Sequence, residues 1–405
     1  MRGLVAVFGF LVLLGIASGS HADLDMRAIV VSSPNRDCAE TPVSVVLTPP
    51  SGYKSVVLHG PNGVVVPCQY QEIGKKIRLM WIADPLEKGS SRTYRAEFST
   101  IRSDVLVAGR SVEVERKGNA VEVSIDGALF TTLNSADGPK PYFYPIIGPT
   151  GDPVTRDYPM KQVDGETKDH PHHRSWWFTF GSVNGIDFWA EKPTAGRIFQ
   201  TKIEALESGP VMGRIRTQNG WVAPGGKTVC TDTREVRIYR VSSGRLVDFD
   251  VTIHAPTEQV TFGDTKEGMM GFRVASSMDV DRKQGGRIVN SRGEKDGDAW
   301  GKPAEWVDYY GPVNGKTVGI AVMDHPTSFR HPTHWHVRTY GLFAANPFGL
   351  SDFPDGKDKD GSHTIPRGGD LRFRYRVFIH EGDTEDAKVA RVADGYSHPP
   401  DVRVE

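Results

Sequence analysis

Cysteine is scarce in this sequence: Cys38, Cys68 and Cys230 are the only cysteines among 405 residues. So small a number excludes a scaffold built on disulfide bonds. Cys38 and Cys68 could pair in an oxidising compartment, which would leave Cys230 alone. The sequence leaves that pairing open.

Long apolar runs are also missing after residue 22, where no segment approaches the ~18 uncharged apolar residues of a membrane-spanning helix. Residues 1–22 differ from the rest. Arg2 is followed by an apolar stretch over residues 4–16 and by the small residues Ser20 and Ala22. This order is typical of a signal peptide. We therefore expect cleavage near Ala22, a periplasmic or secreted protein, and no membrane span.

An excess of charge of either sign is absent too, since 49 Lys and Arg oppose 50 Asp and Glu. A balanced, interspersed charge argues against nucleic acid or an anionic membrane as partner. The sequence has no nucleophile elbow, phosphate-binding loop or dinucleotide fingerprint. It has no heptads and no fixed-period repeats that would set an oligomeric state, which stays open.

What the sequence does contain is many short β-rich runs separated by Gly, Pro, Asn and Ser. This pattern predicts an all-β protein. Residues 23–103 should form a small Ig-like β-sandwich, a packing module or alternatively a carbohydrate-binding module. Residues 104–405 should form a large antiparallel sandwich, with one short helix over 384–394.

Alternation along two long runs indicates which strand faces are buried. Val247, Phe249, Val251 and Ile253 alternate with polar residues, and Phe373, Tyr375, Val377 and Ile379 do the same within 371–380. Because successive side chains of a strand point to opposite sides, one face of each run should lie in the core and the other in water.

Histidine is concentrated in two stretches, DHPHHRSWWFTFG at 169–181 and DHPTSFRHPTHWHVRTY at 324–340. They hold seven of the 13 histidines: His170, His172, His173, His325, His331, His334 and His336. We expect both stretches to line one polar cleft. If 333–340 is a strand, His334, His336, Arg338 and Tyr340 share one face. Alternation also separates Trp176 from Trp177 without deciding which faces the cleft.

Such a cleft suits acid–base chemistry, because histidine titrates near neutral pH and a nearby carboxylate can act with it. The candidate carboxylates are Glu267, Asp324 and Asp308. Arginine offers a rigid fork for hydroxyls or a carboxylate. Tryptophan offers a flat apolar face for a sugar ring.

A metal site is the main competing interpretation. His334-Trp335-His336 is an H-x-H motif, and two imidazoles with a carboxylate can bind a divalent transition metal. Arg338 follows where a third, acidic ligand would be useful, so another carboxylate would have to supply it. The Asp-rich loop 352–362 departs from a calcium loop and is interpreted as a solvated turn.

Four segments carry a family resemblance: 170–189 (HPHHRSWWFTFGSVNGIDFW), 265–274 (TKEGMMGFRV), 306–326 and 333–349. They resemble an uncharacterised bacterial family labelled PmoA-like, over roughly residues 104–382. The resemblance implies a galactose-mutarotase-like supersandwich whose relatives act on or bind sugars. It does not imply a genuine methane monooxygenase subunit, which spans the membrane. Ser175 departs from the family pattern, where a glycine is expected.

The leading hypothesis is therefore an exported enzyme that transfers a proton at or near the anomeric carbon of a carbohydrate, as an epimerase, lyase or hydrolase. The alternatives are a metal-dependent enzyme using His334 and His336, and a non-catalytic glycan-binding protein. The catalytic candidates are His173, His334, His336, Glu267 and Asp324. The substrate-binding candidates are His170, His172, Arg174, Trp176, Trp177, His325, Arg338, Tyr340 and Asn346.

Overall fold

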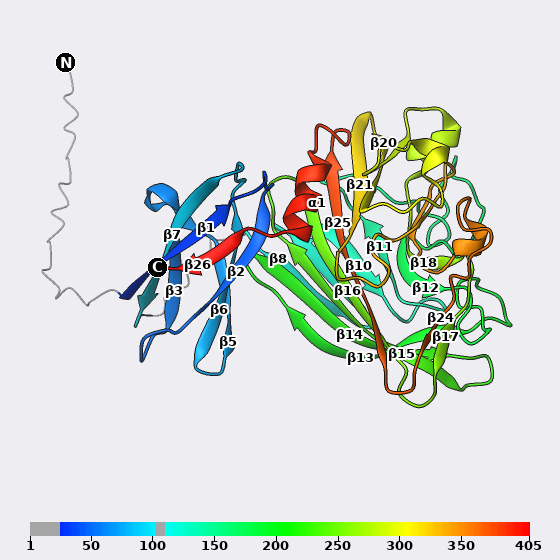
Figure 1. Ribbon diagram of the computed structural model, residues 1–405, viewed down its shortest axis with the longest axis horizontal. Coiled ribbons are helices and arrows are strands. Elements are labelled where there is room, and N and C mark those ends of the chain that lie inside the picture. Colours follow the sequence, from blue (N-terminus) through cyan, green and yellow to red (C-terminus); the bar gives the residue numbers. More distant parts are fainter. Residues whose placement is uncertain (1–24, 102–109) are drawn as a thin grey trace, which may run out of the picture.

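Strands dominate the computed structural model, which describes residues 25–101 and 110–405 (Figure 1). The all-β prediction is confirmed. The predicted signal peptide at 1–22 lies outside the described residues. Within the described part of the chain, no helix is both long enough and apolar enough to cross a membrane.

The N-terminal residues form a small sandwich of two antiparallel sheets (Figure 1). Its inner faces are built by alternation: in β6, Ile77, Leu79 and Trp81 are fully buried between more exposed neighbours. One sheet has the order β26 (Asp401–Val404), β1 (Asp25–Ser33), β7 (Ser90–Ser99), β3 (Ser55–His59) and β4 (Val65–Val66). The other has the order β2 (Thr41–Leu47), β6 (Lys76–Ala83) and β5 (Cys68–Ile73).

The chain returns to this small sandwich at its C-terminal end. β26 pairs antiparallel with β1, from Ile29 opposite Val404 to Ser32 opposite Asp401. The sequence-based prediction had assigned residues 401–404, as part of 104–405, to the large sandwich. Cys38, Cys68 and Cys230 are all free thiols, so the structure contains no Cys38–Cys68 bridge.

The large sandwich consists of two eight-stranded antiparallel sheets. The first sheet has the order β22 (Trp335–Val337), β23 (Leu342–Ala345), β18 (Gly268–Arg273), β12 (Trp176–Phe180), β11 (Tyr142–Ile146), β10 (Ala128–Asn134), β9 (Ala120–Ile125) and β8 (Val112–Lys117). The second sheet has the order β13 (Arg197–Glu207), β14 (Met212–Val222), β15 (Thr228–Tyr239), β16 (Arg245–His254), β25 (Asp370–Glu381), β21 (Lys316–Asp324), β20 (Trp306–Val313) and β19 (Arg287–Asn290).

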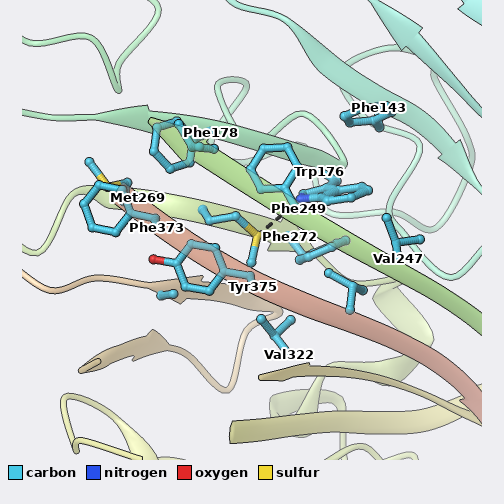
Figure 2. Close-up of a cluster of buried hydrophobic side chains, with 14 of the residues drawn as sticks. Phe143, Trp176, Phe178, Val247, Phe249, Met269, Phe272, Val322, Phe373 and Tyr375 are labelled. Atoms are coloured by element: carbon cyan, nitrogen blue, oxygen red, sulfur yellow. Dashed lines mark hydrogen bonds between the residues drawn. The ribbon is translucent and has the colours of Figure 1, made fainter. Parts of the chain in front are cut away.

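The main core lies between these two sheets and is rich in aromatic rings (Figure 2). The inward faces predicted for 245–254 and 371–380 are confirmed, since the apolar members of both runs are buried. The opposite face of β16, predicted to be wet, is covered instead. Asp248 is buried there because the guanidinium of Arg376 on β25 donates to it at 2.7 Å.

β12 decides which tryptophan belongs to the core. Trp176 points between the sheets, where it stacks on Phe143 and Phe272 and contacts Phe249 (Figure 2). Trp177 points to the other side of the first sheet and packs with Trp189. The outer face of the first sheet at β12 is therefore the floor of the region described below.

Short elements complete the fold. The helix α1 (Val389–Ser397) begins later than predicted, because residues 384–388 form turns and Lys388 has a φ of 53°. A two-stranded sheet pairs β17 (Val260–Phe262) with β24 (His363–Ile365). The 3-10 helices are η1 (Pro61–Gly63), η2 (Ser276–Met278), η3 (Val280–Arg282), η4 (Asp296–Ala299) and η5 (Leu350–Asp352).

Candidate functional site

The two histidine-rich stretches meet at one open pocket of about 680 Å³ on the outer face of the first sheet. This volume lies within the ~300–1,000 Å³ usual for small-molecule sites. The pocket is lined by His170, Pro171, His172, His173, Asp187, Trp189, Ala190, Glu191, Lys192, Lys266, Glu267, His336, Arg338 and Tyr340. Two segments besides the histidine stretches, 187–192 and 266–267, contribute most of the charged side chains of this wall.

A column of stacked rings joins the two stretches. His170 lies between His173, with ring centroids 4.7 Å apart and planes 7° apart, and Tyr340, at 5.3 Å and 6°. His173 stacks in turn on Trp177 at 5.3 Å. Trp177, the outward-facing residue of β12, therefore forms one end of the column, and Tyr340 of the second histidine-rich stretch forms the other.

Arg156 is a fully buried arginine that shapes the loop before β12. Its guanidinium donates to the carbonyl oxygens of Thr167 at 3.0 Å, Asp169 at 2.8 Å and His170 at 3.3 Å. A guanidinium can satisfy several carbonyls at once because its five donors lie in one rigid plane. The loop is thereby bent tightly enough that His170 takes a φ of 45°.

Asp169 and His170 form a carboxylate–imidazole pair. His170 Nδ1 lies 2.8 Å from Asp169 Oδ2, and the same carboxylate accepts from Arg156 and, at 3.0 Å, from Arg273 Nη2. Although partial burial raises it, the charge of Arg273 and the hydrogen bonds from Arg156 and His170 lower the pKa of Asp169 to about 2. At neutral pH Asp169 is ionised, so it can accept a hydrogen bond from His170 Nδ1–H, which leaves the lone pair of Nε2 free to act as a base.

His173 and His336 have the opposite arrangement. Arg273 Nη1 donates to His173 Nδ1 at 3.2 Å, and Trp300 Nε1 donates to His336 Nδ1 at 2.9 Å. Burial, reinforced by Arg338, lowers the pKa of His336 to about 3, and burial together with neighbouring cations holds the pKa of His173 well below its ordinary range. Both rings are neutral with the proton on Nε2, which makes them hydrogen-bond donors rather than bases.

The side of the pocket near His172 is held by an ion-pair group. Glu191 binds the Arg174 guanidinium through two nitrogens, at 2.8 Å for Nε and 2.8 Å for Nη2, and also accepts from the buried Lys140 at 2.8 Å. Burial, followed by the charge of Lys140, lowers the pKa of His172 to about 4. Arg174 is therefore engaged by protein, and the role predicted for it as a direct substrate ligand is not supported by its contacts.

Glu267 supplies the accessible carboxylate of the pocket. Its side chain is 37% exposed, and Oε1 lies 3.5 Å from the ammonium of Lys266. Its backbone is fixed because Glu267 O accepts from Gly181 N at 2.7 Å, next to the end of β12. A carboxylate that is anchored by backbone and open to solvent can exchange protons with a ligand.

Asp324 and His325, by contrast, lie away from this pocket. Asp324 is buried at the end of β21 and accepts from His331 Nδ1 at 2.9 Å and from Thr333 N at 2.9 Å. Burial raises the pKa of Asp324. His325 contacts Arg374 and lines a separate hollow of about 340 Å³. Neither Asp324 nor His325 therefore lines the pocket in which the other candidates meet.

Three further predicted residues also lie outside the pocket wall. Trp176 is in the core and cannot stack on a ligand. Asn346 is fully buried, and its Oδ1 accepts from Phe348 N and Gly349 N, which fixes a turn. His334 precedes β22, which spans only Trp335–Val337 of the predicted strand 333–340; it stacks on Phe353 at 5.8 Å and is not part of the pocket wall. Trp177 supports the ring column but is itself only 1% exposed.

The H-x-H metal site has no support in the arrangement of side chains. Residues 25–101 and 110–405 contain no group of three or more His, Cys, Asp or Glu that could hold a metal ion. One nitrogen of His336 is already bonded to Trp300, and Phe353 faces both His334 and His336. The carboxylate that the motif needed as a third ligand is not beside it.

Ser175, where the family pattern has a glycine, does not line the pocket. It is fully buried, with its hydroxyl 2.7 Å from that of Thr155. Its φ of 56° explains why a glycine would suit the position, since glycine alone adopts this region freely.

Several residues of the site were not found from sequence. Asp169 opens the histidine-rich stretch 169–181, and the only sequence signal for its role is that it directly precedes His170. Arg156 and Glu191 lie in segments without any motif. Arg273 and Trp189 lie in segments that carry the family resemblance, but neither was given a role there. These residues were missed because their role depends on contacts between distant segments.

The fold and the pocket together define an all-β sandwich protein with a histidine-lined polar site. The chain belongs to a family of unknown function (DUF6807), whose model matches residues 120–394. The PmoA-like label suggested by the sequence is not confirmed by this match. A search of curated proteins gave no match.

Among solved structures, the chain is similar to an alpha-mannosidase from Enterococcus faecalis V583. The sequence identity is 11% and the TM-score is 0.43. The similarity covers 94% of this chain and 46% of that one, so this chain spans about half the length of the mannosidase. At such values the likeness carries no argument about activity.

Proposed function

We propose that this protein is a carbohydrate-active enzyme in which His170 moves a proton at or next to the anomeric carbon of a sugar. The observation that supports the proposal is the Asp169–His170 pair in the wall of the 680 Å³ pocket. The His170 side chain is 40% exposed, whereas His173 and His336 are buried and bonded through Nδ1. His170 is thus the pocket histidine best suited to act as a base.

In the proposed step, His170 Nε2 accepts a proton from the sugar, and the positive charge that develops on the imidazole is stabilised by Asp169. In an epimerisation, Glu267 in its protonated form returns a proton to the same carbon. In an elimination, the His170 imidazolium gives its proton to the oxygen of the leaving group as the C–O bond breaks. This assignment differs from the sequence hypothesis, in which the catalytic histidine was His173, His334 or His336. The hydrogen bonds to Nδ1 leave His173 and His336 as neutral donors, and His334 lies outside the pocket.

The character of the pocket supports a sugar as the ligand. The Nε2–H groups of the neutral His173 and His336 can donate to hydroxyls, and so can Arg338. Trp189 and Tyr340 contribute aromatic surface to the same wall. A few directed polar groups beside aromatic surface are typical of small polar ligands.

The test is incubation of the purified protein with reducing sugars, oligosaccharides and 3-keto-glycosides, followed by NMR. Once a turned-over sugar is found, His170→Asn should lower kcat by ~10²–10⁴, the usual contribution of a positioned acid–base group. His254→Asn is a matched control, because His254 forms a similar pair with Asp370 at 2.6 Å on a part of the large sandwich outside the pocket.

Turnover that survives in His170→Asn would remove His170 from the mechanism. A protein that binds sugars in calorimetry but converts none of them would be a glycan-binding protein, and the enzymatic proposal would fail. Equal losses in His170→Asn and His254→Asn would show a general effect on folding rather than on the site.

A further inference from the structure

Arg338 is an unusual cation in this pocket. Its guanidinium lies over the ring of Trp300 at 4.9 Å and near the ring of Tyr340 at 5.6 Å. No carboxylate of the described residues lies within 4.0 Å of it, and its side-chain nitrogens have no hydrogen bond to them. The aromatic faces hold the guanidinium in place without consuming its N–H donors, which point outward in the plane of the group.

The other arginines around the site are each matched with a carboxylate. Arg174 is bound by Glu191, and Arg156 and Arg273 share Asp169. Arg174 thus has a carboxylate partner, whereas Arg338 has none among the described residues. A guanidinium that is positioned and left without an acidic partner is suited to an acidic group of a ligand.

The remaining charges of the wall favour the same sign of ligand. Glu191 is shared by two cations, Lys140 and Arg174, and Asp187 accepts from the backbone N–H groups of Trp189 and Ala190. Glu267 has Lys266 beside it. Lys192, like Arg338, has no ion pair with a described residue. Each carboxylate of the wall therefore has a donor or a cation beside it, whereas the cations Lys192 and Arg338 have no carboxylate partner among the described residues.

From this arrangement we infer that the pocket takes an acidic sugar, whose carboxylate is bound by the fork of Arg338. The inference rests on the proposed function and specifies its substrate class as uronic acids. A planar carboxylate matches the planar guanidinium through two parallel hydrogen bonds, which neutral hydroxyls cannot provide. In this inference the carboxylate is a recognition group bound by Arg338, and the proton that His170 moves is still the one at or next to the anomeric carbon.

The experiment is calorimetric binding of glucuronic and galacturonic acid disaccharides, compared with their methyl esters and with the matching neutral disaccharides. The methyl ester keeps the shape of the ligand and removes its charge. A charge-assisted bond to Arg338 should make the acid bind roughly 10- to 100-fold more tightly than its ester. Arg338→Gln should abolish that ratio, with a much smaller loss of affinity for the neutral disaccharides than for the acids.

Arg338→Lys keeps the charge but loses the fork, so the acid-to-ester ratio should fall to an intermediate value. Arg197→Gln is the matched control, since Arg197 also lies over an aromatic ring, Phe199, at 5.5 Å but on β13, outside the pocket. It should leave every affinity unchanged. Should Arg338→Gln fail to fold, the Arg338→Lys ratio decides.

Esters or neutral disaccharides that bind as tightly as the acids would overturn the inference. Turnover of neutral sugars, dependent on His170, would then still support the proposed function. Preference for acids that persists unchanged in both Arg338 variants would likewise overturn the role of Arg338. Absence of binding by every disaccharide, together with absence of turnover, would overturn both proposals.

Discussion

Replacing Asp169 with Asn tests how the pocket orients its base. The carboxylate of Asp169 accepts from three groups: His170 Nδ1, Arg156 and Arg273. Asparagine has nearly the same shape but offers one acceptor oxygen and an NH₂ group. If the oxygen stays on the arginines, the NH₂ group faces His170 Nδ1. The imidazole must then carry its proton on Nε2 and can no longer act as a base.

The expected effect on rate follows from this tautomer change. Asp169→Asn should lower kcat by ~10²–10⁴ with little change in KM, because the base is lost while the ring stays in its stack. Stability should fall as well. Breaking a buried ion pair costs about 3–5 kcal/mol, and since Asp169 is 33% exposed we expect about 1–3 kcal/mol after allowing for solvent screening.

The assay combines steady-state kinetics with urea denaturation of the wild type, Asp169→Asn, His170→Asn and the double variant. Asp169 and His170 act as a unit, so the double variant should be no slower than the slower single variant. Full turnover in Asp169→Asn would refute the pairing as the source of the base. Losses that multiply in the double variant would refute the idea that the two residues serve one step.

Two further predictions concern stability. Trp176→Ala should lower the free energy of unfolding by about 3–5 kcal/mol, because it opens a cavity between Phe143, Phe249 and Phe272; a urea midpoint close to that of the wild type would contradict the core position. His336 stays neutral in the folded state down to a pKa of about 3, whereas an unfolded histidine binds a proton near pH 6.5. The wild type should therefore lose stability as pH falls below about 6.5. His336→Gln should reduce that slope by about 1 kcal/mol per pH unit, and equal slopes in urea titrations between pH 6 and 4.5 would contradict it.

Much of the fold could be predicted from sequence because the strand signal is local. The alternation of Val247, Phe249 and Val251 with polar residues requires one buried face, and these side chains are buried. The same rule separated Trp176 from Trp177 but could not say which one faces the core. A one-residue shift in register exchanges the two faces, and only the pairing of β12 with β11 and β18 fixes the register.

The candidate site was predictable only in part. Dense histidine marked the two stretches that meet at the pocket, and Arg338 and Glu267 were recognised as candidates. The division of labour among the histidines was not predictable, because the protonation of each ring depends on a partner from elsewhere in the chain. Arg273 on β18 and Trp300 after η4 are such partners. Asp324 carries the same Asp-His-Pro triplet as Asp169, yet it is buried away from the pocket.

By itself the sequence determined an all-β chain, its inward-facing residues, two histidine-rich segments, and the expectation of export through residues 1–22, which stays a prediction. These properties depend on neighbours along the chain. The tertiary structure alone decided that His170 stacks between His173 and Tyr340, that Asp169 is its partner, and that Arg338 has no carboxylate partner among residues 25–101 and 110–405. The physical reason is that hydrogen bonding, burial and charge compensation are set by atoms that are close in space, whatever their separation along the chain.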